Sequence, residues 1–180
     1  MTREPRVPLG QDARPLGRDA ELVRLLADYQ DTVVRSRCLD PVTTELVRLR
    51  CARQHDCRIC QTLRLADAAA AGVDDDLTAK IDHYETSDLS ERHKTALRIV
   101  DAVIWRPTEL SGALVQQAHM SFTADELAEI LVDITKWSTQ KIHVALGTDG
   151  ADRLPVNEQG VAYFGFDETG RVATMGPTPT

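Results

Sequence analysis

The sequence predicts an all-α fold, with one compact helical domain of about six or seven helices between irregular N- and C-terminal tails. Apolar residues recur every three or four positions between about Leu16 and Gly147, and no stretch there alternates with a period of two. Residues typical of helix caps and helix ends fall at the boundaries of these repeats. The chain has 180 residues, enough to bury one core without disulfides or a metal. The predicted boundaries are an arm over 1–15, the helical domain over 16–148 and a tail over 149–180.

Two helices are predicted at the start of the domain. The first carries an apolar stripe from Leu22 to Val33. Asp40 followed by Pro41 is typical of an N-cap and the first helical position, so the second helix begins there.

A third helix is predicted to begin at Cys57, where Asp56 can cap it, and to run through an alanine-rich stretch to Gly72. A short fourth helix follows over Asp75 to Tyr84.

The second half of the domain has the clearest local signals. Ser90 can cap a fifth helix, which Pro107 ends, and another helix follows from about Glu109 to His119. The sequence Thr123 to Glu126 is a capping box. We expect it to open one long helix that ends at Gly147.

The C-terminal tail is rich in Gly, Pro and Thr. Two short apolar segments, Val161 to Phe166 and Arg171 to Thr174, predict a small β-hairpin within it.

Composition excludes several classes of protein. The formal net charge is −7, which disfavours attraction to a phosphate backbone, so we expect no nucleic-acid partner. Apolar runs are too short for a membrane span, and the N-terminal residues carry arginines and prolines rather than the apolar segment of a secretory signal. We therefore expect a cytoplasmic protein whose thiols are reduced, and neither a metal nor a cofactor.

Cys57 and Cys60 form the most informative motif. Their two-residue spacing at the expected start of a helix favours a reactive thiolate, because free backbone N–H groups and the helix dipole stabilise negative charge there. A disulfide between residues three apart needs local adjustment, which is typical of bonds that are easily reduced. Half of a zinc site or two inert thiols would give the same spacing, and both stay open. Cys38 and Cys51 belong to no motif, and we expect both to be small buried apolar residues.

Glu45 is the candidate proton acceptor. Helical spacing places it on the apolar stripe of the second helix, while Arg48 and Arg50 are placed on the solvent side. A desolvated carboxylate has a raised pKa and suits proton transfer near pH 7. The alternative is an ordinary acid in the first turn of a helix that reaches solvent.

Arg64 and His55 are the candidate supporting residues. Arg64 is expected on the same helix face as the two cysteines, where its charge would stabilise a thiolate. The alternative for Arg64 is a surface ion pair with Asp67. His55 is the histidine that the sequence places nearest to the thiols.

Glu45, Cys57 and Cys60, taken with their spacing, resemble the signature of the alkyl hydroperoxidase D-like branch of the carboxymuconolactone decarboxylase family. The likeness continues over Leu89 to Arg92 and reaches Gly147. The resemblance implies an alkyl hydroperoxidase D-like helical fold, a homo-oligomer, and a thiol pair that reduces hydroperoxides or disulfides.

The resemblance also implies roles for particular residues. The residue that matches Glu45 relays protons to the thiols in this family, and a thioredoxin-like or lipoyl partner supplies electrons. Ile59 and Arg64 stand where that branch carries histidines, so we expect His55 to substitute as the base. The helix-dipole argument makes Cys57 the more activated thiol, whereas a position nearer solvent would make Cys60 the attacker, so either thiol could attack. The alternatives are a decarboxylase-type enzyme without redox cycling and a redox-sensing oligomer.

Overall fold

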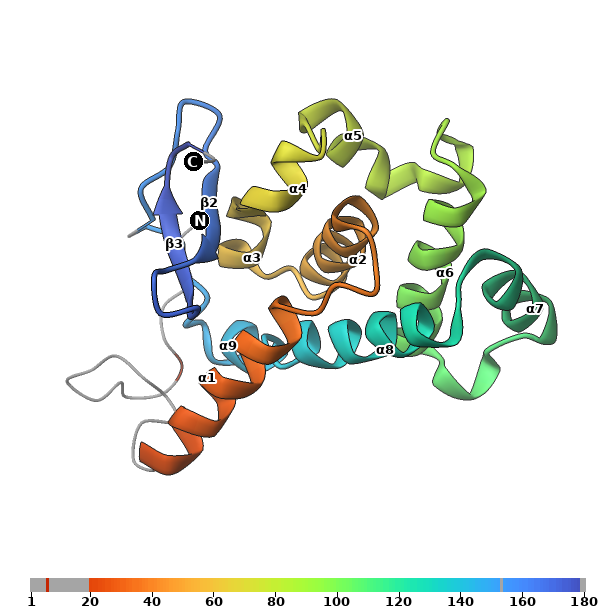
Figure 1. Cartoon of the computed structure of the whole chain (residues 1–180), viewed down its shortest axis with the longest axis horizontal. Coiled ribbons are helices and arrows are strands. Elements are labelled where there is room, and N and C mark those ends of the chain that lie inside the picture. The colour runs from red at the N-terminus through yellow and green to blue at the C-terminus, as the bar shows by residue number, and fades with distance from the viewer. Residues whose placement is uncertain (1–5, 7–19, 153, 179–180) are drawn as a thin grey trace.

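The computed structural model describes residues 6, 20–152 and 154–178 and confirms a mostly helical chain, to which a small sheet is added (Figure 1). The predicted arm over 1–15 lies outside the described residues except for Arg6, whose backbone N–H donates to the carbonyl of Leu146 over 2.8 Å. In chain order, the elements are α1 (Ala20–Val34), α2 (Pro41–Gln54), α3 (Arg58–Thr62), β1 (Leu63–Leu65), α4 (Ala66–Ala70), α5 (Asp75–Ala79), η1 (Lys80–Thr86), α6 (Glu91–Trp105), η2 (Pro107–Glu109), α7 (Gly112–Ser121), α8 (Ala124–Ser138), α9 (Lys141–Leu146), β2 (Ala162–Phe166) and β3 (Val172–Gly176).

Three predicted helix starts are confirmed by their hydrogen bonds. The Asp40 carboxylate accepts from the backbone of Thr43 at the start of α2, and the Ser90 hydroxyl caps α6 in the same way. Thr123 and Glu126 form both bonds of the capping box at the start of α8. These caps satisfy N–H groups that the first turn of a helix leaves without partners.

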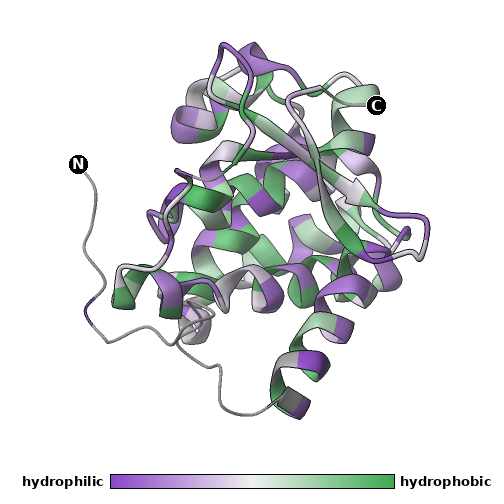
Figure 2. Cartoon of the chain, turned by 90° about the vertical axis from the view of Figure 1, so that its left-hand side faces the viewer, coloured by the Kyte–Doolittle hydropathy of each residue, from purple (hydrophilic) through white to green (hydrophobic). Residues whose placement is uncertain are grey.

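Helix α2 is the centre of the core and packs against α6 and α8 (Figure 1). Each helix carries both hydrophobic and hydrophilic residues, as Figure 2 shows, so its apolar side can meet its neighbours while its polar side faces water. The fully buried apolar side chains of this core include Leu46, Val47, Leu49, Leu97, Val100, Ile130 and Ile134.

The predicted third helix is wrong, because the chain from Cys57 to Gly72 is divided into α3, β1 and α4. Leu63 adopts an extended backbone and begins a strand that pairs with β2, far along the sequence. Asp56 does not cap α3, since it has a positive φ of 52° and Cys57 occupies the N-cap position, where its side chain makes no capping hydrogen bond to the backbone.

The predicted C-terminal hairpin is confirmed as β2 and β3, which pair antiparallel. The sheet order is β1-β2-β3, and β1 pairs with β2 in parallel, with Leu63 opposite Ala162 and Leu65 opposite Phe164. The hairpin is therefore joined to the segment that carries the cysteines. Its residue Phe164 packs in the main core, with its ring 6.2 Å from that of Trp137.

The long helix predicted from Thr123 to Gly147 is interrupted. Helix α8 ends at Ser138, and α9 begins at Lys141. Gly147 ends α9 with a φ of 71°, which glycine adopts without strain. Among the described residues, no helix has the length and apolar character that crossing a bilayer requires.

Candidate active site

Cys57 and Cys60 lie together at the start of α3. Both side chains are buried, both are free thiols, and their sulfur atoms are 2.6 Å apart. Ala52, Ile59 and Val144 pack around them. The juxtaposition of the two sulfurs that the spacing predicts is present.

The two thiols differ in acidity. The S–H of Cys57 donates to the sulfur of Cys60, and this bond, together with the positive charges of Arg48 and Lys136, lowers the pKa of Cys60. The same bond and burial raise the pKa of Cys57. Cys60 is therefore the thiol that ionises first.

The helix-dipole argument favoured Cys57 as the more activated thiol, and the structure points to Cys60 instead. Helix α3 has only five residues, and its first N–H is occupied, because Arg58 donates to the carboxylate of Asp149 over 3.0 Å. The negative charge of Asp149 also contributes to the raised pKa of Cys57. The Asp149 carboxylate therefore already accepts from the backbone N–H that would otherwise stabilise a thiolate at the start of α3.

Glu45 and Arg48 form a buried ion pair in the middle of α2. Their side chains are 0% and 1% exposed, and the carboxylate accepts from the guanidinium over 2.6 and 2.8 Å. Arg48 also donates to the carbonyl of Cys60 over 2.8 Å and to the carbonyl of Leu63. Placing Arg48 on the solvent side was wrong, because its guanidinium is buried, and the carboxylate of Glu45 and the two carbonyls replace the water that it loses. Arg50 is half-buried and pairs with Asp101.

The buried pair links the acid to the thiols indirectly. Glu45 is inside the protein, as the apolar stripe predicts, but its oxygens accept from Arg48 and, at 3.4 Å, from the backbone N–H of Leu65. Arg48 in turn holds the carbonyl of Cys60 and lowers the pKa of that thiol. This geometry makes Glu45 the anchor of Arg48, while its role in a proton relay stays a prediction.

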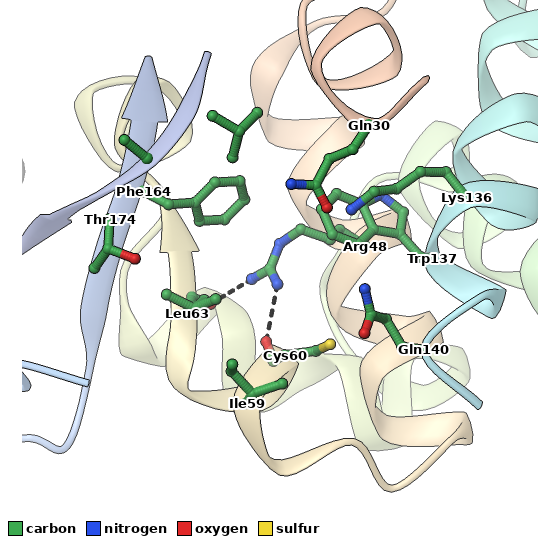
Figure 3. A pocket seen from close by; sticks show the side chains of 12 residues that line it. Gln30, Arg48, Ile59, Cys60, Leu63, Lys136, Trp137, Gln140, Phe164 and Thr174 are labelled. Atoms are coloured by element: carbon green, nitrogen blue, oxygen red, sulfur yellow. Dashed lines mark hydrogen bonds between the residues drawn. The ribbon is translucent and has the colours of Figure 1, made fainter. Parts of the chain in front are cut away.

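A pocket of about 240 Å³ opens beside Cys60 (Figure 3). Helices α1, α2, α3 and α8 and the C-terminal hairpin all contribute to it, so elements far apart in sequence meet there. Its apolar and aromatic lining residues are Ile59, Leu63, Trp137, Phe164, Val172 and Ala173. Its polar lining residues are Gln30, Arg48, Cys60, Lys136, Gln140 and Thr174.

Lys136 is a pocket residue that the sequence analysis missed. It is 3% exposed, and its ammonium lies 3.1 Å from the centre of the Trp137 ring. Burial lowers the pKa of Lys136 to about 7. A signal was available, because Glu129, Asp133, Lys136 and Gln140 follow one another at helical spacings of three and four beside the apolar stripe.

Arg64 does not reach the thiols. It lies on β1 rather than on a helix with the cysteines, and its guanidinium donates to the carbonyls of Gln61 and Leu63. Asp67, its expected surface partner, pairs with Arg37 instead, over 2.9 Å.

His55 is buried at the end of α2, and within the described chain neither of its ring nitrogens has a hydrogen-bond partner. Burial and the charge of Lys141 lower the pKa of His55 to about 4, so the ring is neutral at pH 7. It does not line the pocket beside Cys60. Its role as a base stays a prediction.

The remaining cysteines differ from each other. Cys51 is buried in the main core, as predicted, whereas Cys38 is exposed, which contradicts the prediction. The backbone N–H of Cys38 donates to Glu129 in the turn after α1, and its side chain is left at the surface. Across the residues that the structure describes, no group of three or more His, Cys, Asp or Glu is placed to hold a metal ion.

Comparison with known structures supports an alkyl hydroperoxidase D-like fold for the chain. A crystal structure of a protein of unknown function from Agrobacterium tumefaciens, for which an AhpD antioxidant-defence role is suggested, matches with a TM-score of 0.65. The match covers 79% of this chain and 95% of that one at 19% identity, so it shows the fold alone.

Sequence relatives extend the comparison without adding an activity. Two uncharacterized proteins of Mycobacterium tuberculosis, from strains CDC 1551 and H37Rv, are 41% identical over 144 residues. The alignment covers 76% of this chain, and the chain spans about half the length (51%) of those relatives. No protein-family model matches the chain, so membership of the carboxymuconolactone decarboxylase family stays a prediction.

Proposed function

We propose that the protein is a thiol-disulfide oxidoreductase that uses Cys57 and Cys60 to reduce organic hydroperoxides. The observation that carries the proposal is the pair of sulfurs 2.6 Å apart, one of which lines a pocket beside two cationic side chains. The likeness in fold to a structure with a suggested antioxidant role supports the same chemistry.

Cys60 is the attacking residue in this proposal. It lines the pocket, its pKa is lowered, and the Cys57 thiol that donates to it lies behind it. The Cys60 thiolate attacks the terminal oxygen of the hydroperoxide and breaks the O–O bond. The sulfur is oxidised to a sulfenic acid, and the alkoxide that leaves takes a proton from water to become an alcohol.

Cys57 then resolves the sulfenic acid. Its sulfur attacks the sulfur of Cys60, a disulfide forms, and the hydroxyl leaves as water with the proton of the Cys57 thiol. A thioredoxin-like or lipoyl dithiol returns two electrons and two protons by thiol-disulfide exchange, and is itself oxidised to a disulfide. Arg48 acts as a positioning residue, because it holds the carbonyl of Cys60 and supplies positive charge near the thiolate.

The test measures hydroperoxide consumption with an excess dithiol reductant. We expect Cys60→Ser to abolish thiol-dependent turnover. Cys57→Ser should still form a sulfenic acid at Cys60, which dimedone traps, but no intramolecular disulfide. Cys38→Ser is the matched control, because it removes an exposed thiol away from the pocket and should leave the rate unchanged.

Unchanged consumption in Cys60→Ser would overturn the proposal. Formation of the disulfide without turnover by any dithiol would favour the redox-sensing alternative instead. The homo-oligomeric state and the cytoplasmic location belong to the same proposal, and size-exclusion chromatography with light scattering tests the former.

A further inference from the structure

In the described part of the chain, no carboxylate pairs with Lys136. Within the described residues, its ammonium forms no hydrogen bond or ion pair, although the side chain is almost completely buried. The face of the Trp137 ring covers one side of the ammonium. Such a contact offsets only part of the cost of burying a cation, so the other side is left able to bind an anion.

Lys136 stands where two pockets meet. The pocket beside Cys60 and a larger, mostly apolar pocket of about 500 Å³ share three lining residues, Gln30, Lys136 and Gln140. Figure 3 shows these three side chains directed toward the same space. Two neutral amides that can donate N–H groups therefore flank one ammonium, and these donors could surround a single anionic group.

We propose that Lys136, Gln30 and Gln140 form a carboxylate-binding subsite, so that the preferred substrate is a small organic hydroperoxide that carries one carboxylate. The identity of the reacting group as a hydroperoxide rests on the proposed function. The binding of a carboxylate by the subsite does not, because it requires no reaction at Cys60. The carboxylate accepts hydrogen bonds from the three side chains, and the reacting end extends along the apolar wall to the sulfur.

The size and charge of the pocket select this class. A cavity of about 150 Å³ holds benzene, so the 240 Å³ beside Cys60 holds a one-ring or similar apolar body with a small substituent. Trp137 and Phe164 supply aromatic surface for that body. Because Glu45 already neutralises Arg48, Lys136 is the positive charge that no described carboxylate of the pocket lining pairs with, and a single charge matches a monoanion better than a dianionic phosphate.

Other charged groups also act on Lys136. Cys60 and Cys57 favour its charged form, as does Asp133 one turn earlier on α8, while Arg48 opposes it. His143 of α9 lines the larger pocket with it. The thiolate of Cys60 is the main competitor for the ammonium. Its removal in Cys60→Ser should therefore preserve or strengthen the binding of an added carboxylate.

The binding test compares benzoate with benzamide, its neutral counterpart, by isothermal titration calorimetry on the full chain. We expect wild type and Cys60→Ser to bind benzoate at least about tenfold more tightly than benzamide, as a charged hydrogen-bonded contact predicts. Lys136→Met should abolish that preference, and Lys136→Arg should retain it. Lys141→Met is the control, because it removes an exposed positive charge on the neighbouring helix.

The pH dependence gives a second measurement. Since the ammonium loses its proton with a pKa of about 7, benzoate affinity should fall by about tenfold for each pH unit above that value. In Lys136→Arg, whose side chain keeps its charge over this range, that tenfold fall should be absent. Circular dichroism of each variant checks that it is folded.

Three outcomes would overturn the subsite: equal affinity for benzoate and benzamide, an unchanged preference in Lys136→Met, or inorganic phosphate binding more tightly than benzoate. Binding of benzoate without any hydroperoxide reduction would instead contradict the proposed function and leave the subsite standing. If wild type is active, Lys136→Met should lower kcat/KM for both substrates, because loss of the ammonium raises the pKa of Cys60. The loss should be larger for cumene hydroperoxide carrying a para-carboxylate than for cumene hydroperoxide itself.

Discussion

The buried ion pair between Glu45 and Arg48 offers the strongest test of how the site is held together. Both side chains are almost fully buried, so removing one partner leaves the other as an uncompensated charge. Such a change costs about 3 to 5 kcal/mol. We therefore expect Glu45→Met to lower the free energy of unfolding by about that amount.

Arg48→Met should cost more. The guanidinium also satisfies the carbonyls of Cys60 and Leu63, and each buried carbonyl left without a donor adds about 1 to 3 kcal/mol. In the double variant no charge remains, so only the carbonyls stay unsatisfied. Its loss should be no larger than that of Arg48→Met alone, which corresponds to a coupling energy of about 3 kcal/mol or more.

Urea unfolding at pH 7 and 25 °C, followed by far-ultraviolet circular dichroism, measures all four proteins of this cycle. Single losses that simply add in the double variant would refute the reasoning, as would a loss below about 1 kcal/mol for Arg48→Met, the range of an exposed pair. The folded variants also report on the site, because loss of Arg48 should raise the pKa of Cys60 and slow its alkylation by iodoacetamide at pH 7.

Three further predictions concern Cys57, Asp133 and Phe164. Cys57→Ala removes the S–H donor to Cys60 and should shift the pH profile of Cys60 alkylation upward, and an unchanged profile would exclude that bond as a cause. Burial, followed by the charge of Glu129, raises the pKa of Asp133 to about 8, so this group holds its proton in the folded state at pH values where the unfolded chain has lost it. Stability should therefore fall as the pH rises toward 8, and thermal unfolding of Asp133→Asn between pH 5 and 9 should show a shallower fall than wild type. Phe164→Ala should cost about 3 to 5 kcal/mol in urea unfolding, because this ring joins the hairpin to the core; a loss near zero would mean that the hairpin contributes nothing to the stability of the domain.

Local signals predicted much of the helical fold. Asp40, Ser90 and Thr123 start helices where the sequence predicts, because a cap depends on groups within about four positions. The segment from Cys57 to Gly72 was mispredicted for the opposite reason. Its alanines favour a helix, and only pairing with the distant β2 makes Leu63 to Leu65 extended.

The site was predicted in part. The spacing of Cys57 and Cys60 correctly predicted two adjacent sulfurs, since residues three apart on a helix share a face. Arg48 and Lys136 were missed, because a charged side chain in a helix is ordinarily at the surface. Their burial depends on Glu45 in one case and on the Trp137 ring in the other.

The parallel pairing of β1 with β2 sets an order in which the pocket is completed during synthesis. Leu63 pairs with Ala162, about 100 residues later, so a ribosome working at about 5 to 20 residues per second needs roughly 5 to 20 s to supply the partner strand. During that interval the nascent chain already contains both cysteines but lacks the aromatic wall that Phe164 provides. Both thiols are thus synthesised before the wall that closes one side of their pocket.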